Sequence, residues 1–417
     1  MANLSDPDAA IAWLRSPAAI RERCALVLAA ARDDRLDHFA LRPERLEPTA
    51  GYVAETIATN YPDLDVPTHS RWRHFAVGGR DRWAGLAARL DGVPREEVAR
   101  VRFDLAVTSV LLDAGAGADW RYREPASGEI HARSEGLAVA SFDLFSSGMF
   151  SADPARPLRA DAAGLAGVTE ARLAEAFQVG PDNPLVGLEG RAALLRDLGA
   201  ALEAAPSLFG GEAPRVGALF DYLIQDAGPD GVGAAAILDA VLAGLGPIWP
   251  GRIALGGVNL GDVWRHPAVV TGDRTGDLTG GLVPFHKLSQ WLSYSLIEPL
   301  EDAGLAVTGV AALTGLPEYR NGGLLVDLGV LAPRHPGVLG ETHEVGSEVV
   351  VEWRALTVAL LDDLAPLVRA RLGKSEAEWP LSKVLEGGTW SAGRRIARER
   401  RPGGGPPISV ASDGTVF

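Results

Sequence analysis

Helical periodicity is the feature that most constrains the fold of this chain. Residues 16–39 begin with a serine followed by a proline, a combination that starts helices. Residues 96–113 read as a helix that stops at the glycines of GAGADW. Between positions 285 and 300, apolar residues recur every three or four positions, at Phe285, Leu288, Leu292, Leu296 and Leu300. Strand signals are few, so we expect a mostly α fold.

Two short segments depart from the helical pattern. Residues 118–135 alternate around a Pro-Ala-Ser-Gly turn, and residues 248–264 are rich in glycine and β-branched residues, so both predict small β-hairpin insertions. The 417 residues are 47% hydrophobic and contain no low-complexity linker. We therefore expect a single large helical domain over residues 1–417. Within it we distinguish an N-terminal part (1–150), a helical insertion (about 151–265) and a candidate catalytic core (280–417).

Charge and composition exclude several classes of partner. A net charge of -14 and a pI near 5.1 argue against nucleic acid, whose phosphates require a basic surface. The single cysteine, Cys24, excludes a disulfide framework and is expected to be buried. The N-terminus lacks a signal-peptide pattern, and the longest largely apolar run, residues 304–317, is too short to cross a bilayer. We expect a cytoplasmic protein without a membrane partner.

A polar stripe accompanies the apolar stripe of residues 285–300. Lys287, Gln290, Tyr294 and Glu298 follow one another at spacings of three, four and four, so their side chains project in roughly one direction. Two interpretations remain, a solvated outer face or the wall of a pocket. Pro299 cannot donate a hydrogen bond to the carbonyl of Ser295, so the helix is expected to kink or end after Glu298.

Two further segments combine charged residues with an apolar or aromatic setting. Residues 68–83 interleave arginines with aromatics; such a segment either stacks on a base and clamps a phosphate, or packs its arginines over core aromatics. Residues 347–373 are apolar nearly all round their first half, which marks a buried element. Glu352 and Arg354 within it either pair with each other or serve a ligand, since an unpaired buried charge is unfavourable by several kcal/mol.

Common catalytic motifs are absent. The chain has no GxxxxGK[ST] loop, no GxGxxG after a strand, no HExxH and no Gly-x-Ser-x-Gly elbow. Its eight histidines show no metal-ligand spacing beyond a loose pair at His69 and His74. We therefore expect neither a metal nor a cofactor. Carboxylates, arginines, aromatics and a lysine remain, which suit acid, base and electrostatic catalysis.

A series of motifs along nearly the whole chain resembles the uracil-catabolism family, the fourth protein of the URC pathway and relative of the yeast uracil-regulated proteins. The motifs are HSRWRHFAVGGRDRW, DLAVTSVLLDAGAGADWRYRE, RSEGLAVASFDLFSSGMFS, NPLVGLEGR, PFHKLSQWLSYSLIEPLEDAG, TGLPEYRNGG, EGGTWSAGR and SDGTVF. The resemblance implies a role in a non-reductive breakdown of uracil through a ribosylurea intermediate. It names a pathway and not a reaction.

Shorter motifs are similar to those of queuosine-salvage N-glycosidases. Those enzymes carry an aromatic-x-Lys-x-x-Gln helix, an acid-Tyr-Arg motif and a Glu-x-Arg apolar helix in this order. The corresponding residues here are Phe285, Lys287 and Gln290, then Glu318, Tyr319 and Arg320, then Glu352 and Arg354. The acid is Glu here and Asp in the salvage enzymes. This similarity implies a DNA-glycosylase-like helical core and N-glycosidase chemistry.

The combined expectation is an N-ribosidase, a hydrolase that cleaves the N-glycosidic bond of ribosylurea or its 5-phosphate. Cleavage passes through an oxocarbenium-like state that a carboxylate stabilises, and Glu318 is the first choice for this role. Asp327 is either a second carboxylate or a helix residue facing solvent. The ureido leaving group needs a proton or a strong hydrogen bond, which Glu298, Tyr294 or Gln290 could supply.

The remaining candidate residues bind the small ribosyl or ribose-phosphate substrate. Lys287, Arg320 and Arg354 are expected to hold phosphate and ribose hydroxyls. Phe75 and Trp83 are candidate stacking walls, and the binding set is completed by His74, Tyr319 and Glu352. We expect Lys287, Glu318 and Glu352 to converge on one cavity. A ribosyl transferase and a non-enzymatic, ligand-binding regulator of uracil metabolism remain as alternatives.

Overall fold

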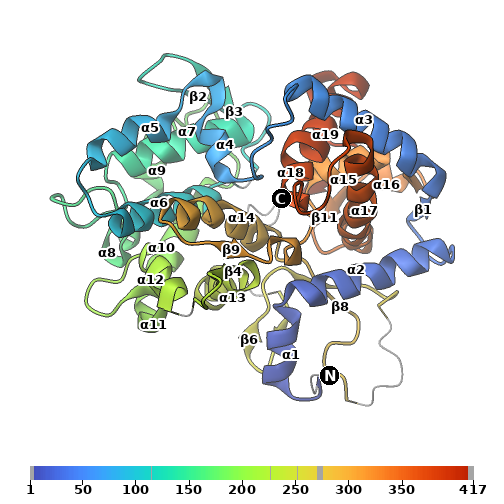
Figure 1. Cartoon of the computed structure of the whole chain (residues 1–417), viewed down its shortest axis with the longest axis horizontal. Coiled ribbons are helices and arrows are strands. Elements are labelled where there is room, and N and C mark those ends of the chain that lie inside the picture. The colour runs from blue at the N-terminus through green and yellow to red at the C-terminus, as the bar shows by residue number, and fades with distance from the viewer. Residues whose placement is uncertain (1–3, 114, 226, 251, 270–275, 412–417) are drawn as a thin grey trace. The chain divides into compact units, whose positions relative to one another are not determined.

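The computed structural model describes residues 4–113, 115–225, 227–250, 252–269 and 276–411 (Figure 1). Helices dominate, and every sheet among these residues has only two strands. The expected mostly α class is thereby confirmed. The terminal SDGTVF motif lies outside the described residues.

The chain divides into two compact units. Unit 1 comprises residues 1–69, 251–290 and 310–412, and unit 2 comprises residues 70–250, 291–309 and 413–417. Helix α14 (Lys287–Asp302) contributes its first turn to unit 1 and its remainder to unit 2. Both units therefore combine segments that are distant in sequence.

Unit 1 contains the two termini of the described chain. Its helices are α1 (Pro7–Leu14), α2 (Pro17–Arg32), η1 (Pro43–Arg45), α3 (Leu46–Asn60), η5 (Val310–Ala312), α15 (Tyr319–Asp327), α16 (Gly337–Gly340), α17 (Glu348–Leu372), α18 (Leu381–Lys383), the π-helical η6 (Val384–Trp390), α19 (Ser391–Arg400) and η7 (Pro402–Gly404). Its strand pairs are β1 (Phe39–Leu41) with β10 (Leu331–Pro333), β5 (Ala254–Leu255) with β6 (Val258–Asn259), β7 (Val263–Arg265) with β8 (Leu282–Pro284), and β11 (Thr342–Glu344) with β12 (Ser409–Ala411).

Helices also predominate in unit 2. Its helices are α4 (Arg71–Phe75), η2 (Val77–Gly79), α5 (Arg82–Ala87), η3 (Ala88–Leu90), α6 (Arg95–Leu111), α7 (Arg133–Ser146), α8 (Ala162–Ala166), α9 (Glu170–Ala176), α10 (Leu188–Ala204), α11 (Pro206–Phe209), α12 (Ala218–Gln225), α13 (Ala234–Leu245) and η4 (Gly246–Ile248). Strand β2 (Arg121–Arg123) pairs with β3 (Ile130–Ala132), and β4 (Val232–Gly233) pairs in parallel with β9 (Val307–Thr308). The hairpins β2–β3 and β5–β6 lie where the sequence predicts small hairpin insertions.

Helix α17 is the central element of unit 1. It packs against α2 and α3, and Figure 1 shows these blue N-terminal helices beside the red C-terminal ones. Helix α2 begins as expected, because the Ser16 hydroxyl accepts a hydrogen bond from the Ala19 N–H and Pro17 takes the first helical position. Gly373, in the left-handed conformation at a φ of 65°, ends α17. Tertiary contacts thus join the first and last parts of the sequence in one core.

Two glycines bring α15 close to its neighbouring helices. A Cβ on Gly322 of α15 would lie 2.6 Å from the Trp353 ring of α17, and a Cβ on Gly393 of α19 would lie 2.2 Å from the carbonyl oxygen of Arg320. Both distances are shorter than any real contact, so only glycine fits at either position. The close packing fixes the N-terminus of α15, where Glu318 lies.

Helix α14 does not end before Pro299, contrary to one of the two expectations from the sequence. It continues to Asp302 with Pro299 inside. The carbonyl of Ser295, which has no N–H partner at position 299, instead accepts a hydrogen bond of 2.8 Å from the indole N–H of Trp72. A tertiary contact within unit 2 therefore replaces the missing helical hydrogen bond.

None of the helices in the described part of the chain combines the length and apolar character needed to span a bilayer.

Candidate active site

The Glu318 carboxylate lies at the N-terminus of α15. One of its oxygens accepts a hydrogen bond from the Arg320 N–H and the other from the Asn321 N–H, each at 2.6 Å, so Glu318 caps the helix. The side chain is buried. Burial raises the pKa of the Glu318 carboxyl above its ordinary value, although these hydrogen bonds and the nearby Lys287 charge lower it. Glu318 is thus a buried carboxyl held by two backbone N–H groups, and the charges of Lys287 and Arg320 both act on it.

Asp262 and Arg354 form a bidentate ion pair in this region. The Arg354 guanidinium donates to both Asp262 oxygens, each at 2.8 Å, and Asp262 also accepts from the Trp264 indole and the Lys287 backbone N–H. Burial alone would raise the pKa of the Asp262 carboxyl, but the Arg354 charge and these hydrogen bonds outweigh it and hold the pKa well below its ordinary value. The pair ties α17 to the start of α14.

Arg354 also connects this pair to the segment before Glu318. Its Nε lies 3.4 Å from the Pro317 carbonyl oxygen, and its guanidinium stacks 4.2 Å from the centre of the Phe285 ring. Glu352 does not pair with Arg354, so the interpretation that the two charges satisfy each other is wrong. Two residues along a helix turn the side chain by about 200°, which gives Glu352 and Arg354 different surroundings.

Lys287 and Gln290 project from the first turn of α14 and both are buried, so this part of the polar stripe does not face solvent. The Gln290 amide nitrogen donates to the Thr314 hydroxyl at 3.0 Å, and its oxygen lies 3.4 Å from the Thr314 N–H. Gln290 therefore holds Thr314, four residues before Glu318, while the Lys287 charge lowers the pKa of Glu318.

Tyr319 and Arg320 follow Glu318 on the first turn of α15. The Arg320 guanidinium is buried, stacks 4.7 Å from the centre of the Tyr319 ring and donates to the Gly404 carbonyl at 2.9 Å. Lys287, Glu318, Tyr319 and Arg320 thus belong to one region of unit 1, which is the region that the sequence singles out.

Asp327, the last residue of α15, neither faces solvent nor accompanies Glu318. Both of its oxygens accept hydrogen bonds from the Arg401 guanidinium, at 2.7 and 2.5 Å. Nine residues of helix separate it from Glu318 by about 13 Å at 1.5 Å per residue. This spacing exceeds that of two carboxylates serving one anomeric carbon, so the structure gives Asp327 a pairing role with Arg401.

Glu352 is fully buried on α17. One of its oxygens accepts the Phe39 N–H at 2.8 Å, and the other lies 3.5 Å from Nε2 of His266. These contacts differ from those of Lys287 and Glu318. The expected convergence therefore joins Lys287 with Glu318, whereas Glu352 contacts β1.

The other candidate residues belong to unit 2. Glu298 accepts a hydrogen bond from the Ser70 hydroxyl at 2.6 Å and forms an ion pair with Arg73, and Tyr294 is fully buried. The polar stripe of α14 is thus divided between the two units, and its Glu298 end already has a cationic partner.

His74, Phe75 and Trp83 form part of an aromatic cluster in unit 2. Trp72 packs edge-on against both Phe75 and Trp83, and the His74 ring meets the Trp291 ring edge-on at 5.7 Å. The Arg102 guanidinium lies 4.2 Å from the centre of Trp72 and 5.2 Å from that of Trp83. Arg71, an arginine of the segment 68–83, lies 6.0 Å from the centre of the Phe75 ring, which is the arrangement of an arginine packed over a core aromatic.

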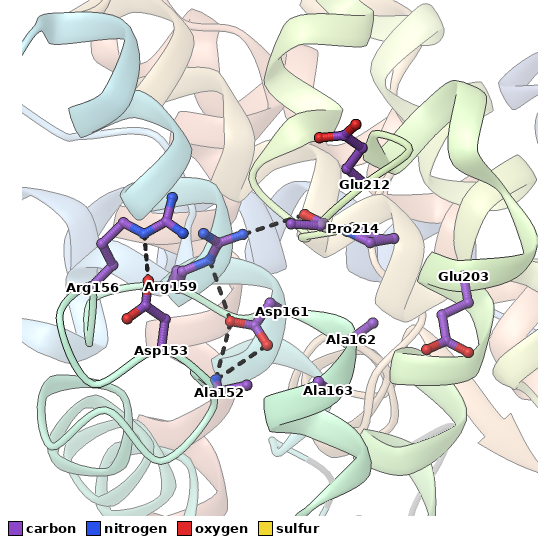
Figure 2. Close-up of a pocket in the computed structure, with 11 residues that line it drawn as sticks. Ala152, Asp153, Arg156, Arg159, Asp161, Ala162, Ala163, Glu203, Glu212 and Pro214 are labelled. Atoms are coloured by element: carbon purple, nitrogen blue, oxygen red, sulfur yellow. Dashed lines mark hydrogen bonds and ion pairs between the residues drawn. The ribbon is translucent and has the colours of Figure 1, made fainter.

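Unit 2 also contains a surface pocket of about 320 Å³ (Figure 2). Its charged lining consists of Asp153, Arg156, Arg159, Asp161, Glu203 and Glu212. Arg156 pairs with Asp153 at 2.7 Å, and Arg159 lies 3.3 Å from Asp161. None of the candidate residues from the sequence lines this pocket, and its arginines are already paired with carboxylates.

Two groups of side chains among the described residues bring potential metal ligands together. One consists of Glu124, Glu129 and His131, but Arg82 holds both oxygens of Glu124, at 2.8 and 2.9 Å. The other consists of His38, Glu348 and Glu352 and has no such competing cation on Glu352.

Asp262 is a buried charged partner in this region that the sequence did not single out as a candidate. Its partner Arg354 is a candidate from the sequence, but 92 positions separate the two. The available signal was a charged residue placed between a glycine-rich turn and a buried tryptophan, which is too weak to assign a role.

Comparisons with known proteins agree with the motifs. The family model described as a protein of unknown function, DUF1688, matches residues 13–417. Protein urg3 of Schizosaccharomyces pombe is 40% identical over 416 residues, covering 98% of this chain and 99% of that protein. Uracil catabolism protein 4 of Lachancea kluyveri is 36% identical over 445 residues, covering 98% and 99%. The resemblance to the uracil-catabolism family is confirmed, and the similarity to queuosine-salvage enzymes stays a prediction. The chain therefore belongs to the DUF1688 family.

Proposed function

We propose that the protein acts in uracil catabolism as an N-ribosidase, hydrolysing ribosylurea or its 5-phosphate. In the reaction the bond between the anomeric carbon and the urea nitrogen breaks. Water supplies a hydroxyl to the sugar carbon and a proton to the nitrogen, giving ribose, or ribose phosphate, and urea. The names of two full-length relatives, Protein urg3 and Uracil catabolism protein 4, support the metabolic part of this proposal.

The observation that carries the chemical part is the environment of Glu318. A buried carboxylate at a fixed position can stabilise an oxocarbenium-like state and orient the attacking water, because it does not reorganise during the reaction. Two backbone N–H groups hold Glu318, and Lys287 favours its ionised form. Each carboxylate oxygen has a second lone pair, so the capping hydrogen bonds leave acceptor capacity for water.

Cations around Glu318 suit the rest of a phosphorylated substrate. Lys287 and Arg320 lie in the same region, and a lysine and an arginine together can hold a phosphate or ribose hydroxyls. The Arg354 guanidinium is held by Asp262 and lies beside Phe285 and Pro317. Arg354 and Asp262 are therefore assigned as positioning residues for the segment that carries Glu318.

The test is incubation of the purified chain with ribosylurea, ribosylurea 5-phosphate and uridine phosphates, with mass detection of urea and ribose or ribose phosphate. The wild type should release urea from one of the ribosylurea substrates. Glu318→Gln keeps a hydrogen-bond acceptor for the cap but removes the charge, so kcat/KM should fall by about 10²- to 10⁴-fold. Circular dichroism would show whether this variant keeps its helices.

The matched control is Asp81→Asn, because Asp81 caps α5 through the Ala84 N–H at 3.0 Å and is exposed in unit 2. Its kcat/KM should equal that of the wild type. Unchanged turnover by Glu318→Gln would overturn the assignment of Glu318. Release of urea only when inorganic phosphate is present would indicate a transferase, and tight ribosylurea binding without any product would indicate a binding protein.

A further inference from the structure

Unit 1 contains a group of histidines and glutamates that the proposed hydrolysis does not use. The nearest potential ligand atoms of His38, Glu348 and Glu352 all lie within 4.8 Å of one another. Nε2 of His38 is 3.7 Å from a Glu348 oxygen. The group combines an imidazole with two carboxylates from segments that are more than three hundred positions apart in sequence.

The backbone fixes the two histidines of this region next to each other. His38 directly precedes β1, and its carbonyl accepts the Arg334 N–H at 2.9 Å as the β1–β10 ladder continues. The next residue, His335, therefore lies beside His38, and Nδ1 of His38 is 2.9 Å from Nε2 of His335. The Arg334 side chain pairs with Asp34 and the Phe39 carbonyl, so its charge is directed to other partners.

The two glutamates belong to the first turns of α17. Glu348 and Glu352 are four residues apart, so their side chains share one face of the helix. Like charges at this spacing repel each other, and Glu352 is fully buried, which makes its negative charge still less favourable without a cation. One Glu352 oxygen accepts the Phe39 N–H, whereas the other makes no hydrogen bond in the described part of the chain and lies 3.5 Å from Nε2 of His266.

The hydrogen bonds of the histidines assign different roles to them. In the tautomer in which His38 donates from Nδ1 to His335, its Nε2 presents a lone pair toward the glutamates, which is the arrangement of a metal-binding histidine with an outer hydrogen-bond acceptor. His266 differs, because its Nδ1 accepts the Ala268 N–H at 3.2 Å. Its Nε2 therefore carries the proton in the neutral ring and faces Glu352 as a donor, 3.5 Å away.

We propose that His38, Glu348 and Glu352 bind a divalent transition-metal ion that links β1 to the N-terminus of α17. Two ligand atoms that each lie about 2.1 Å from a tetrahedral metal ion are about 3.4 Å from each other. The ligand atoms of this group lie within 4.8 Å of one another, so small side-chain movements would bring them to that spacing. Imidazole with two carboxylates suits Zn²⁺, Mn²⁺ or Fe²⁺, whereas Mg²⁺ and Ca²⁺ prefer oxygen ligands alone. Glu348 is partly exposed, which leaves room for water as a further ligand.

The metal-free full-length chain tests this proposal by isothermal titration with Zn²⁺ and Mn²⁺ and by the electron paramagnetic resonance spectrum of Mn²⁺. We expect one specific ion per chain, and weak or absent binding of Mg²⁺ and Ca²⁺. Glu348→Gln and His38→Asn each remove a ligand and should weaken binding by about 100-fold or more, whereas His335→Asn should weaken it by about 10-fold. Saturating Zn²⁺ should raise the Tm of the wild type and leave that of Glu348→Gln unchanged.

Glu129→Gln provides the matched control. Glu129 is also an exposed glutamate in a group with a second glutamate and a histidine, so this variant should bind the metal as the wild type does. Absence of specific binding to the wild type would overturn the proposal, as would unchanged affinity in both Glu348→Gln and His38→Asn. Loss of affinity in Glu129→Gln alone would place the ion at the group of Glu124, Glu129 and His131, and this result would also overturn the proposal.

Discussion

Each oxygen of the Glu318 carboxyl accepts a backbone N–H of α15, and the adjoining helices approach so closely that this end of α15 has little freedom to move. The side chain is consequently fixed by the same contacts that cap the helix. In the proposed reaction the structural and catalytic roles of Glu318 coincide, because the contacts that cap the helix also fix the carboxylate. Burial adds a chemical consequence, since it raises the pKa of this carboxyl.

The raised pKa predicts the acidic side of the pH profile for hydrolysis. The carboxylate is the active form in the proposed reaction, and the fraction in this form falls as the pH drops through the raised pKa. The acidic limb of kcat/KM should therefore lie at higher pH than the ordinary glutamate value. Lys287→Met removes a charge that lowers the pKa of Glu318, so this substitution should move the acidic limb to still higher pH.

Profiles of kcat/KM from pH 4 to 9 for the wild type and Lys287→Met check this prediction. Asp81→Asn, far from Glu318 in sequence, should show the wild-type limb. A limb that Lys287→Met leaves in place would mean that another group controls the acidic side of the profile.

Single residues were predictable from sequence where the local pattern itself required them. Lys287 and Gln290 belong to one short motif and Glu318 to a second one about thirty positions later, and all three lie in unit 1. Asp262 was missed because its role depends on Arg354, and the pairing of Asp327 with Arg401 was missed for the same reason. The partners of such ion pairs are far apart in sequence and have no characteristic spacing, so no sequence pattern predicts which residues pair.

At the scale of elements, α14 shows how tertiary contacts override a local rule. Pro299 predicts a kink or an end, and the second alternative is wrong: the helix continues to Asp302, and the Trp72 indole supplies the hydrogen bond that the proline cannot. The start of α2 was predicted, since the Ser16 cap acts locally. Two-residue strands such as β4 and β9 were not, because their pairing joins residues 75 positions apart.

Trp72 and Pro299 should be coupled energetically. Trp72→Phe removes the donor and leaves the buried Ser295 carbonyl without a partner, which should lower the free energy of unfolding. Pro299→Ala restores a backbone N–H at the position that normally serves Ser295. Trp72→Phe should therefore be less destabilising in the Pro299→Ala background, with a coupling energy of about 1 kcal/mol.

Urea unfolding of the wild type, both single variants and the double variant measures this coupling. The lost stacking of Trp72 on Arg102 is common to both backgrounds and cancels in the cycle. Additive effects of the two substitutions would mean that the Trp72 indole does not replace the helical hydrogen bond.

At the scale of the whole molecule, the sequence predicts the helical class but gives no sign of how the segments are distributed between two units. Composition is similar along the chain, and neither unit is a continuous stretch. Boundaries of that kind follow from contacts between distant segments, such as α17 with α2, and not from linkers that composition would mark.

This discontinuity predicts that unit 2 cannot fold from residues 70–250 alone. Residues 291–309 supply β9, which pairs with β4, and they also supply Ser295 and Glu298, the partners of Trp72 and Arg73. A fragment that joins 70–250 to 291–309 through a Gly/Ser linker of about 20 residues, with a mean span of about 25 Å, should show cooperative thermal unfolding by circular dichroism. Residues 70–250 alone should have less helix and no cooperative transition.

The decisive comparison uses a third fragment in which the order of residues 291–309 is scrambled behind the same linker. It keeps the length and composition of the joined fragment but loses the β9 pairing and the Ser295 and Glu298 contacts, so it should behave like residues 70–250 alone. Equal Tm values for all three fragments would show that residues 70–250 contain a complete folding unit. Recovery of cooperative unfolding only with the native order would show that the end of α14 is part of the core of unit 2, although it follows that core by more than forty positions in the chain.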